Sequence, residues 1–187
     1  MSEHAQSFMA YLIGLKDSDR GALAHLKRSL GFEPGAYPRA YPYIERFVGA
    51  DKHADDPLRR AMYLAAGLFA LHPLHHEGVS FASAFGRIGR ARDSASVEQR
   101  FIALLGADPE SLSTLLRQSV SLLAADGQSC DYVGLLEDLT LCLNPFKPEA
   151  RDQLRQRWAR DFYRAYDPHA ASTDDADTPL PEAESTI

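Results

Sequence analysis

Three histidines and a glutamate crowd into residues 72–77, where the sequence is HPLHHE. Imidazole and carboxylate groups are ligands that zinc favours, and a hydrolase uses such an ion to activate water. A helical zinc motif, however, places two histidines four residues apart on one continuous helix. Here Pro73 directly follows the first histidine and Gly78 closes the segment. Because proline breaks the interior of a helix, the spacing favours a polar loop at a helix end over a metal centre.

The chain carries none of the common catalytic motifs. Its sequence has no nucleophile elbow, P-loop, dinucleotide-binding glycine pattern or paired-acid signature. Cys130 and Cys142 are the only cysteines and lack the CxxC spacing, which favours buried thiols over a disulfide or a zinc site. We therefore expect a protein without enzymatic activity, cofactor or metal, and without a small-molecule substrate.

The stretch 80–123 carries five arginines among apolar residues at helical spacing. These are Arg87, Arg90, Arg92, Arg100 and Arg117. Arginine on a helix surface needs an anionic partner or solvent, and its planar guanidinium suits phosphate oxygens. The pattern therefore points to a polyanion as the partner. A solvated helix face or an internal ion pair is the alternative for each residue.

The acidic residues are unevenly placed along the chain. The formal charge is −6, but residues 168–187 hold five acids and no lysine or arginine. These acids are Asp174, Asp175, Asp177, Glu182 and Glu184. Residues 1–167 keep 20 basic and 21 acidic side chains, so a basic face can coexist with an acidic one. Because residues 168–187 have almost nothing to bury, we expect them to form a disordered acidic tail.

Apolar residues recur at spacings of three and four along most of the chain, and no segment keeps the alternation of a half-buried strand. This periodicity predicts an all-α protein of about nine helices. The residues predicted to face its core include Phe8, Leu12, Leu15, Phe81, Phe85, Phe101, Leu104, Leu154, Trp158 and Phe162.

Capping residues in the sequence predict where several of these helices begin. Aspartate or serine before an apolar run typically caps a helix, and proline is favoured at the first helical position. The predicted caps are Asp17 or Ser18, Asp56, Asp108 and Asp131, and Ser96 with Gln99 is predicted to form a capping box. We also expect loops over residues 32–42 and 72–79, and a short helix over residues 43–48.

No run approaches the roughly 20 apolar residues that a helix needs to span a bilayer. The first four residues, MSEH, lack the basic and then apolar layout of a signal peptide. We therefore expect a cytoplasmic protein that does not interact with membranes.

Six segments form an ordered set along the chain. They are residues 8–12 (FMAYL), 19–31 (DRGALAHLKRSLG), 68–73 (LFALHP), 96–105 (SVEQRFIALL), 115–123 (LLRQSVSLL) and 158–163 (WARDFY). This set resembles the CasB family, the small subunit of the type I-E CRISPR surveillance complex Cascade. The resemblance covers most of the chain before the acidic tail and rests on the order of the segments, because none alone has the specificity of a catalytic signature.

The resemblance implies an all-helical fold of two packed bundles, which we place at residues 1–110 and 111–167. It also implies two copies in Cascade beside other subunits, and no catalytic activity. The family supports the duplex of guide RNA and target strand, and it supports the displaced single strand of opened DNA. Since guide pairing supplies the sequence specificity there, the protein needs basic residues at the backbone and no nucleophile.

The family's basic face, carried over onto matching positions, falls on Lys27, Arg28, Arg87, Arg100 and Arg117. A second group has directions that the sequence does not show, and it comprises Arg39, Arg90, Arg92, Arg157 and Arg160. Two alternatives stay open. One is an assembly spacer whose arginines meet acidic protein surfaces. The other is a metal-dependent hydrolase, built on His72, His75, His76 and Glu77.

Overall fold

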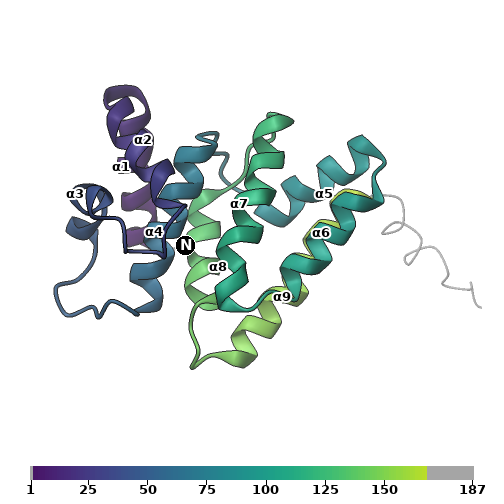
Figure 1. Cartoon of the computed structure of the whole chain (residues 1–187). Coiled ribbons are helices and arrows are strands. Elements are labelled where there is room, and N and C mark those ends of the chain that lie inside the picture. Colours follow the sequence, from purple (N-terminus) through teal and green to yellow (C-terminus); the bar gives the residue numbers. More distant parts are fainter. Residues whose placement is uncertain (1, 168–187) are drawn as a thin grey trace, which may run out of the picture.

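The computed structural model describes residues 2–167, and in this range the chain forms nine α-helices and two short 3₁₀ turns (Figure 1). The helices are α1 (Glu3–Ser18), α2 (Arg20–Ser29), α3 (Tyr41–Ile44), α4 (Pro57–Leu71), α5 (Phe81–Arg92), α6 (Ala95–Leu105), α7 (Pro109–Ala125), α8 (Tyr132–Cys142) and α9 (Pro148–Tyr166). The turns η1 (Pro38–Ala40) and η2 (Glu45–Phe47) flank α3. This part of the chain contains no strand, so the all-α prediction is confirmed. The predicted acidic tail, residues 168–187, lies outside the described residues.

Aspartate caps start three of the helices, as the sequence predicts. The carboxylate of Asp56 accepts hydrogen bonds from the first amides of α4, and Asp108 and Asp131 do so for α7 and α8. Each cap satisfies backbone N–H groups that have no partner inside the helix. Pro57 and Pro109 occupy the first helical positions of α4 and α7, where the missing N–H is not needed.

Two of the predicted caps are wrong. α1 continues through Ser18, whose hydroxyl donates to the carbonyl one turn back at 2.7 Å. Asp19 therefore caps α2 in place of the two residues before it. α6 starts directly after Ser94, which puts Ser96 inside its first turn, and the two serine hydroxyls lie 2.9 Å apart. The predicted capping box between Ser96 and Gln99 does not form.

The short helix predicted over residues 43–48 is shifted in the structure. α3 begins at Tyr41, and Pro42 sits in its first turn, where proline is tolerated. The 3₁₀ turn η2 follows and ends before Val48, which is extended. Pro42, the last residue of the predicted loop, therefore lies in the first turn of α3.

α4 lies at the centre of the molecule (Figure 1). Every residue from 61 to 70 is buried, as expected of a helix that is apolar on all sides. It packs against α2 on one flank and against α7 and α8 on the other. α4 therefore joins the N-terminal and C-terminal helices in one hydrophobic core.

α5 and α9 run parallel and in close contact. Phe81 packs on Trp158 at the start of α5, and Gly89 lies against Tyr166 at its end. Between these points, a Cβ atom at Gly86 would lie 2.3 Å from the carbonyl oxygen of Phe162. The two backbones approach this closely only because glycine has no side chain.

An aromatic core beside this contact confirms the predicted inner stripes. Phe101 of α6 stacks on Phe162 of α9, with ring centroids 4.0 Å apart and planes 7° apart. Phe85 of α5 lies against both rings. Such aromatic pairs contribute about 0.5–1.5 kcal/mol beyond the burial of their surface. The predicted core residues of the first, fifth, sixth and ninth helices are all buried.

Candidate nucleic-acid interface

All ten basic residues predicted for the site are exposed. They lie on several elements: α2, η1, α5, α6, α7 and α9. Two of them, Arg92 and Arg157, pair with carboxylates. The other eight form no ion pair with a described residue: Lys27, Arg28, Arg39, Arg87, Arg90, Arg100, Arg117 and Arg160.

A groove between α6 and α7 brings Arg100 and Arg117 together. This α6–α7 groove has a volume of about 430 Å³ and is lined by Arg100, Thr114, Arg117, Gln118, Ser121 and Leu122. Buried neighbours anchor both arginines, since Phe101 directly follows one and Leu116 directly precedes the other. The lining offers guanidinium, hydroxyl and amide donors, and no carboxylate among the described residues lines it.

A second groove lies between α5 and α9. This α5–α9 groove has a volume of about 370 Å³ and is lined by Ser83, Arg87, Arg90, Asp161, Arg164 and Ala165. Because the two helices are parallel, their carboxyl ends lie side by side and add partial negative charge there. Arg90 and Arg164, in or near the last turns of α5 and α9, offset part of that charge. Three guanidinium groups against one lining carboxylate leave the groove basic.

Arg164 is a groove residue that the sequence reasoning did not place in the site. It lies seven residues after Arg157 on α9, so a stripe of arginines was visible in the sequence. That stripe divides in the structure, because Arg157 turns to a carboxylate on α8 whereas Arg164 shares a groove with Arg87. Placing Arg164 in the site requires knowledge of the contact between α5 and α9. No local sequence pattern indicates that contact.

Arg92 is held at the end of α5 by Asp126, which follows α7. Its Nε and Nη2 donate to the two carboxylate oxygens at 2.9 and 2.5 Å. These hydrogen bonds lower the pKa of Asp126 and raise the pKa of Arg92. The bidentate pair ties the ends of α5 and α7 together, so a phosphate at Arg92 would have to replace an existing anion.

Arg157 is tied to α8 through Asp138. It donates to one oxygen of that carboxylate, and the indole N–H of Trp158 donates to the other at 2.6 Å. Burial raises the pKa of Asp138, although both donors favour the ionised form. Arg157 therefore compensates a largely buried carboxylate between α8 and α9. Arg160 lies exposed on the same helix.

Lys27 and Arg28 lie in the last turn of α2, and Arg39 lies in η1. α2, against which η1 packs, is on the opposite side of α4 from α5 and α6 (Figure 1). The end of α2 nevertheless approaches α7, because its last residues line a small pocket together with Ser113. Ser113 is one helical turn before Arg117. The basic end of α2 therefore borders α7, the helix that carries five of the six residues lining the α6–α7 groove.

The histidines of residues 72–77 turn to different partners. His72 is buried, and its Nε2 lies 2.8 Å from the carbonyl oxygen of Gln128. Nδ1 of His75 accepts a hydrogen bond from the amide of Tyr132 at 3.1 Å. Among the described residues, no three side chains of the metal-binding types are grouped to hold an ion. This loop instead fastens the end of α4 to the start of α8.

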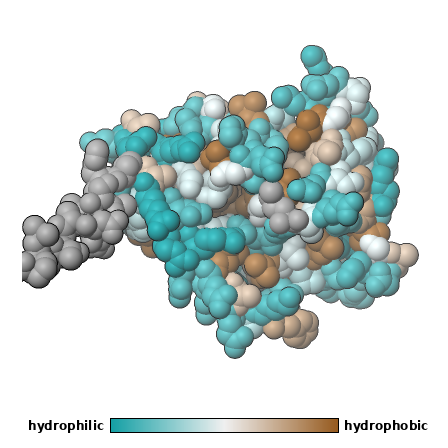
Figure 2. All heavy atoms as spheres, turned by 180° about the vertical axis from the view of Figure 1, so that it is seen from behind, coloured by the Kyte–Doolittle hydropathy of each residue, from teal (hydrophilic) through white to brown (hydrophobic). Residues whose placement is uncertain are grey.

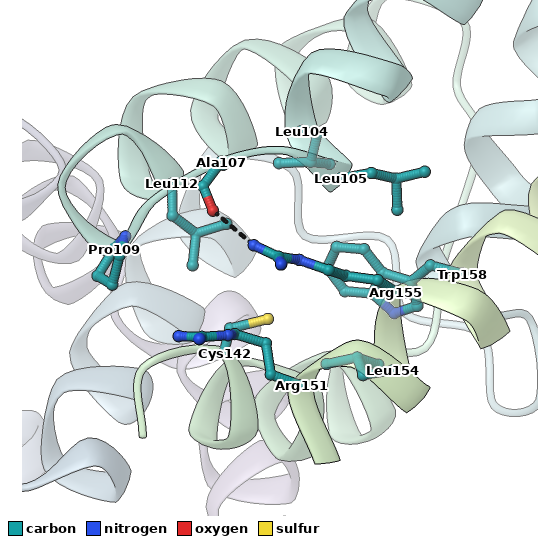
Figure 3. A pocket seen from close by; sticks show the side chains of 10 residues that line it. All are labelled: Leu104, Leu105, Ala107, Pro109, Leu112, Cys142, Arg151, Leu154, Arg155 and Trp158. Carbon is teal, nitrogen blue, oxygen red and sulfur yellow. Dashed lines mark hydrogen bonds between the residues drawn. The ribbon is translucent and has the colours of Figure 1, made fainter. Parts of the chain in front are cut away.

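A narrow pocket bordered by α6, α7, α8 and α9 is too small for a ligand (Figure 3). Its volume is about 20 Å³, which is room for a single water molecule. The walls are mostly apolar, and Arg155 donates to the carbonyl oxygen of Ala107 at 3.1 Å. Burial raises the pKa of the Cys142 thiol to about 12, so it stays protonated and unreactive at neutral pH.

These features define the class of the protein: a small all-helical protein with basic grooves on a hydrophilic surface. Hydrophilic side chains cover most of the face opposite that of Figure 1, and the hydrophobic ones form small separate patches (Figure 2). No helix in residues 2–167 is long and apolar enough to cross a bilayer.

The chain belongs to the CRISPR-associated Cse2 family. The family model for CRISPR-associated protein Cse2 matches residues 22–163. A CRISPR-associated protein Cse2 of Thermus thermophilus is 43% identical over 145 residues, which make up 77% of this chain and 79% of the relative. Two solved CasB structures are also similar to this chain, so the resemblance to the CasB family is confirmed.

Solved structures agree with this assignment. The crystal structure of CasB from Thermus thermophilus is 37% identical, with a TM-score of 0.72 and coverage of 87% of this chain and 99% of that one. CasB from M. ruber is 31% identical, with a TM-score of 0.69 and coverage of 95% and 100%. A chain of a CRISPR RNA-guided surveillance complex shares the fold at 19% identity and a TM-score of 0.71.

Proposed function

We propose that this chain is the small subunit of a type I-E CRISPR Cascade complex and binds nucleic-acid backbone there without sequence specificity. In this role it stabilises the duplex of guide RNA and target DNA, and the displaced DNA strand, during antiviral defence. The observation that carries the proposal is the α6–α7 groove, where Arg100 and Arg117 face solvent with no lining carboxylate among the described residues.

Family membership supports the wider setting of this proposal. The subunit works in the cytoplasm, in two copies, beside other Cascade subunits, guide RNA and opened DNA. It contributes binding and no catalytic step, and it needs neither a metal nor another cofactor.

The chemistry of the groove fits a backbone ligand. Phosphate oxygens are the same in every nucleotide, so contacts to them position a strand without reading its sequence. In a guide-directed complex base pairing supplies the sequence information. Each phosphate that an arginine neutralises releases counterions, which gives log K a slope of about −0.7 per contact against log salt on single strands.

The test is the salt dependence of binding to single-stranded DNA of several unrelated sequences. We expect Arg100→Ala and Arg117→Ala each to weaken binding by a similar factor for every sequence. Each variant should also make the slope of log K against log salt shallower by about 0.7, since one phosphate contact is lost. Fluorescence anisotropy titrations at four or more salt concentrations measure both quantities.

Arg46→Ala is the matched control. Arg46 is also exposed, but it lies in η2 outside both grooves and donates to the carbonyl of Pro42 at 2.9 Å. The Arg46→Ala variant should leave the affinity for single-stranded DNA and the slope of log K against log salt unchanged. A loss limited to one DNA sequence, or an unaltered slope in both groove variants, would contradict the proposal.

The alternative is a helical assembly spacer that bridges other subunits and has no direct nucleic-acid role. Phe146 favours this alternative, because its side chain is 89% exposed in the turn between α8 and α9, where a protein partner could cover it. A spacer predicts that the purified chain does not bind single-stranded DNA even at low salt. It also predicts that Phe146→Ala weakens assembly with the other subunits.

A further inference from the structure

Phe32 is a phenylalanine that remains half exposed to solvent in the fold. It lies just after α2, its side chain is 50% exposed, and its ring stacks on that of Tyr37. The two ring centroids are 4.9 Å apart and the planes differ by 27°. On the other side of the contact, Tyr37 packs near the ring of His25, with its hydroxyl 3.4 Å from Nδ1. Phe32 is therefore the outer ring of a supported stack.

The loop that carries Phe32 is pinned by its own backbone. The amide of Phe32 donates to the carbonyl of Ser29 at 3.0 Å, and the amide of Ala36 donates to that of Glu33 at 2.8 Å. Gly35 takes a positive φ of 90°, and its carbonyl accepts the hydroxyl of Tyr41 at 3.0 Å. The loop holds the phenyl ring outward, so the exposure is part of a defined geometry.

Exposed basic residues lie close to this stack along the chain. Arg28 lies one helical turn after His25 and therefore on the same face of α2. Lys27 and Arg39 are also exposed, and none of these three cations forms an ion pair with a described residue. Glu33 is the acid next to the ring, and its carboxylate is 3.9 Å from Arg60.

The shape beside Phe32 favours a flat ligand over a protein side chain. Protein partners usually insert an anchor residue into a pocket. The pocket that Phe32 lines, together with residues from α2, α4 and α7, has a volume of only about 10 Å³. An exposed ring without a socket, flanked by cations, matches the stacking platforms of proteins that bind single strands.

We propose that Phe32, backed by Tyr37, stacks on an unpaired nucleobase of a single-stranded nucleic acid while Lys27, Arg28 or Arg39 contacts its phosphates. The inference rests on the proposed function and extends it from the backbone to the bases. Its place in the molecule suits this role, because the pocket at Phe32 also includes Ser113, one turn from Arg117 of the α6–α7 groove. Stacking accepts any base, so binding stays independent of sequence.

The experiment compares two probes of equal charge: an oligothymidylate of about 12 nucleotides and an abasic oligomer with the same number of phosphates. The full chain should bind the oligothymidylate more tightly than the abasic oligomer. Phe32→Leu, which keeps an apolar side chain but removes the ring, should weaken oligothymidylate binding by about fivefold or more. It should leave binding of the abasic oligomer unchanged. Phe32→Tyr keeps the ring and should bind both probes like the wild type.

Phe146→Leu is the matched control, since Phe146 is more exposed than Phe32, precedes a lysine and has no ring contact among the described residues. Phe146→Leu should change the affinity neither for the oligothymidylate nor for the abasic oligomer. Equal binding of both probes by wild type and Phe32→Leu would overturn the platform and leave the backbone function standing. Failure of the wild type to bind either probe at low salt would overturn both. If Phe32→Leu alters only assembly with protein subunits, the ring is a protein contact and the proposal is wrong.

Discussion

The carboxylate nearest to an arginine decides whether its charge is available to an outside anion. Arg92 and Arg157 are each paired with a carboxylate, whereas Arg87, Arg100 and Arg117 form no ion pair with a described residue. The sequence predicts that all five are exposed, because helical periodicity separates them from the buried stripes. The sequence does not predict the two ion pairs, since each joins residues far apart in the chain that only the fold brings together.

The buried carboxylate of Asp138 leads to a prediction about pH. Burial raises its pKa in the folded state, so the folded protein binds a proton here more readily than the unfolded chain does. The stability contributed by the protonated group is full below the ordinary carboxyl pKa and is lost as pH rises through the raised pKa. Asp138→Asn removes this titration and keeps an oxygen for the indole of Trp158.

We therefore expect the difference in unfolding free energy between Asp138→Asn and wild type to move in favour of the variant as pH rises from about 4 to 7. Urea unfolding at a series of pH values measures this difference. Parallel pH profiles for the two proteins would show that Asp138 does not titrate with a raised pKa in the fold.

At the scale of the elements, capping chemistry was the most predictable part. Asp56, Asp108 and Asp131 start helices as expected, because an aspartate before an apolar run acts through local hydrogen bonds alone. The end of α1 was predicted wrongly, since Ser18 can bond back into its own helix or cap the next one. The close contact of α5 with α9 was not predictable, because it depends on residues far apart in the chain.

Gly86 gives the element-scale prediction. A Cβ there would lie 2.3 Å from the carbonyl oxygen of Phe162, so α5 and α9 would have to move apart. We expect Gly86→Ala to lower the free energy of unfolding by about 1–3 kcal/mol or more. Chemical denaturation of the purified variant measures this loss.

Gly14→Ala is the opposite case on α1. A Cβ at Gly14 meets no atom within 4 Å, and the residue is helical and exposed. Alanine should therefore raise the free energy of unfolding by about 0.5–1 kcal/mol. If both substitutions destabilise the protein equally, the close approach of α5 and α9 is not the cause.

At the scale of the whole molecule, the basic surface is divided between two grooves and the end of α2. Arg87 and Arg100 lie in different grooves. The division into bundles at residues 1–110 and 111–167 remains a prediction, and α4 contacts helices assigned to both. Sequence patterns identify basic residues but not their neighbours, so they could not show which arginines share a groove.

This division predicts how two groove substitutions combine. Arg87 and Arg100 line grooves that have no residue in common. The effects of Arg87→Ala and Arg100→Ala on the free energy of binding opened DNA should therefore add to within about 0.3–0.5 kcal/mol in the double variant. Titrations of both single variants and the double variant measure the coupling. A larger coupling would mean that one strand segment spans both grooves.

The burial of α4 on every side has a consequence for hydrogen exchange in the molecule. Its amide protons can meet solvent only when helices on both flanks have separated, so their exchange with deuterium reports the global unfolding reaction. The amides of α2 and α9, at opposite sides of this helix, should exchange through smaller openings that cost less free energy. The protection of the α4 amides would then report the free energy of global unfolding.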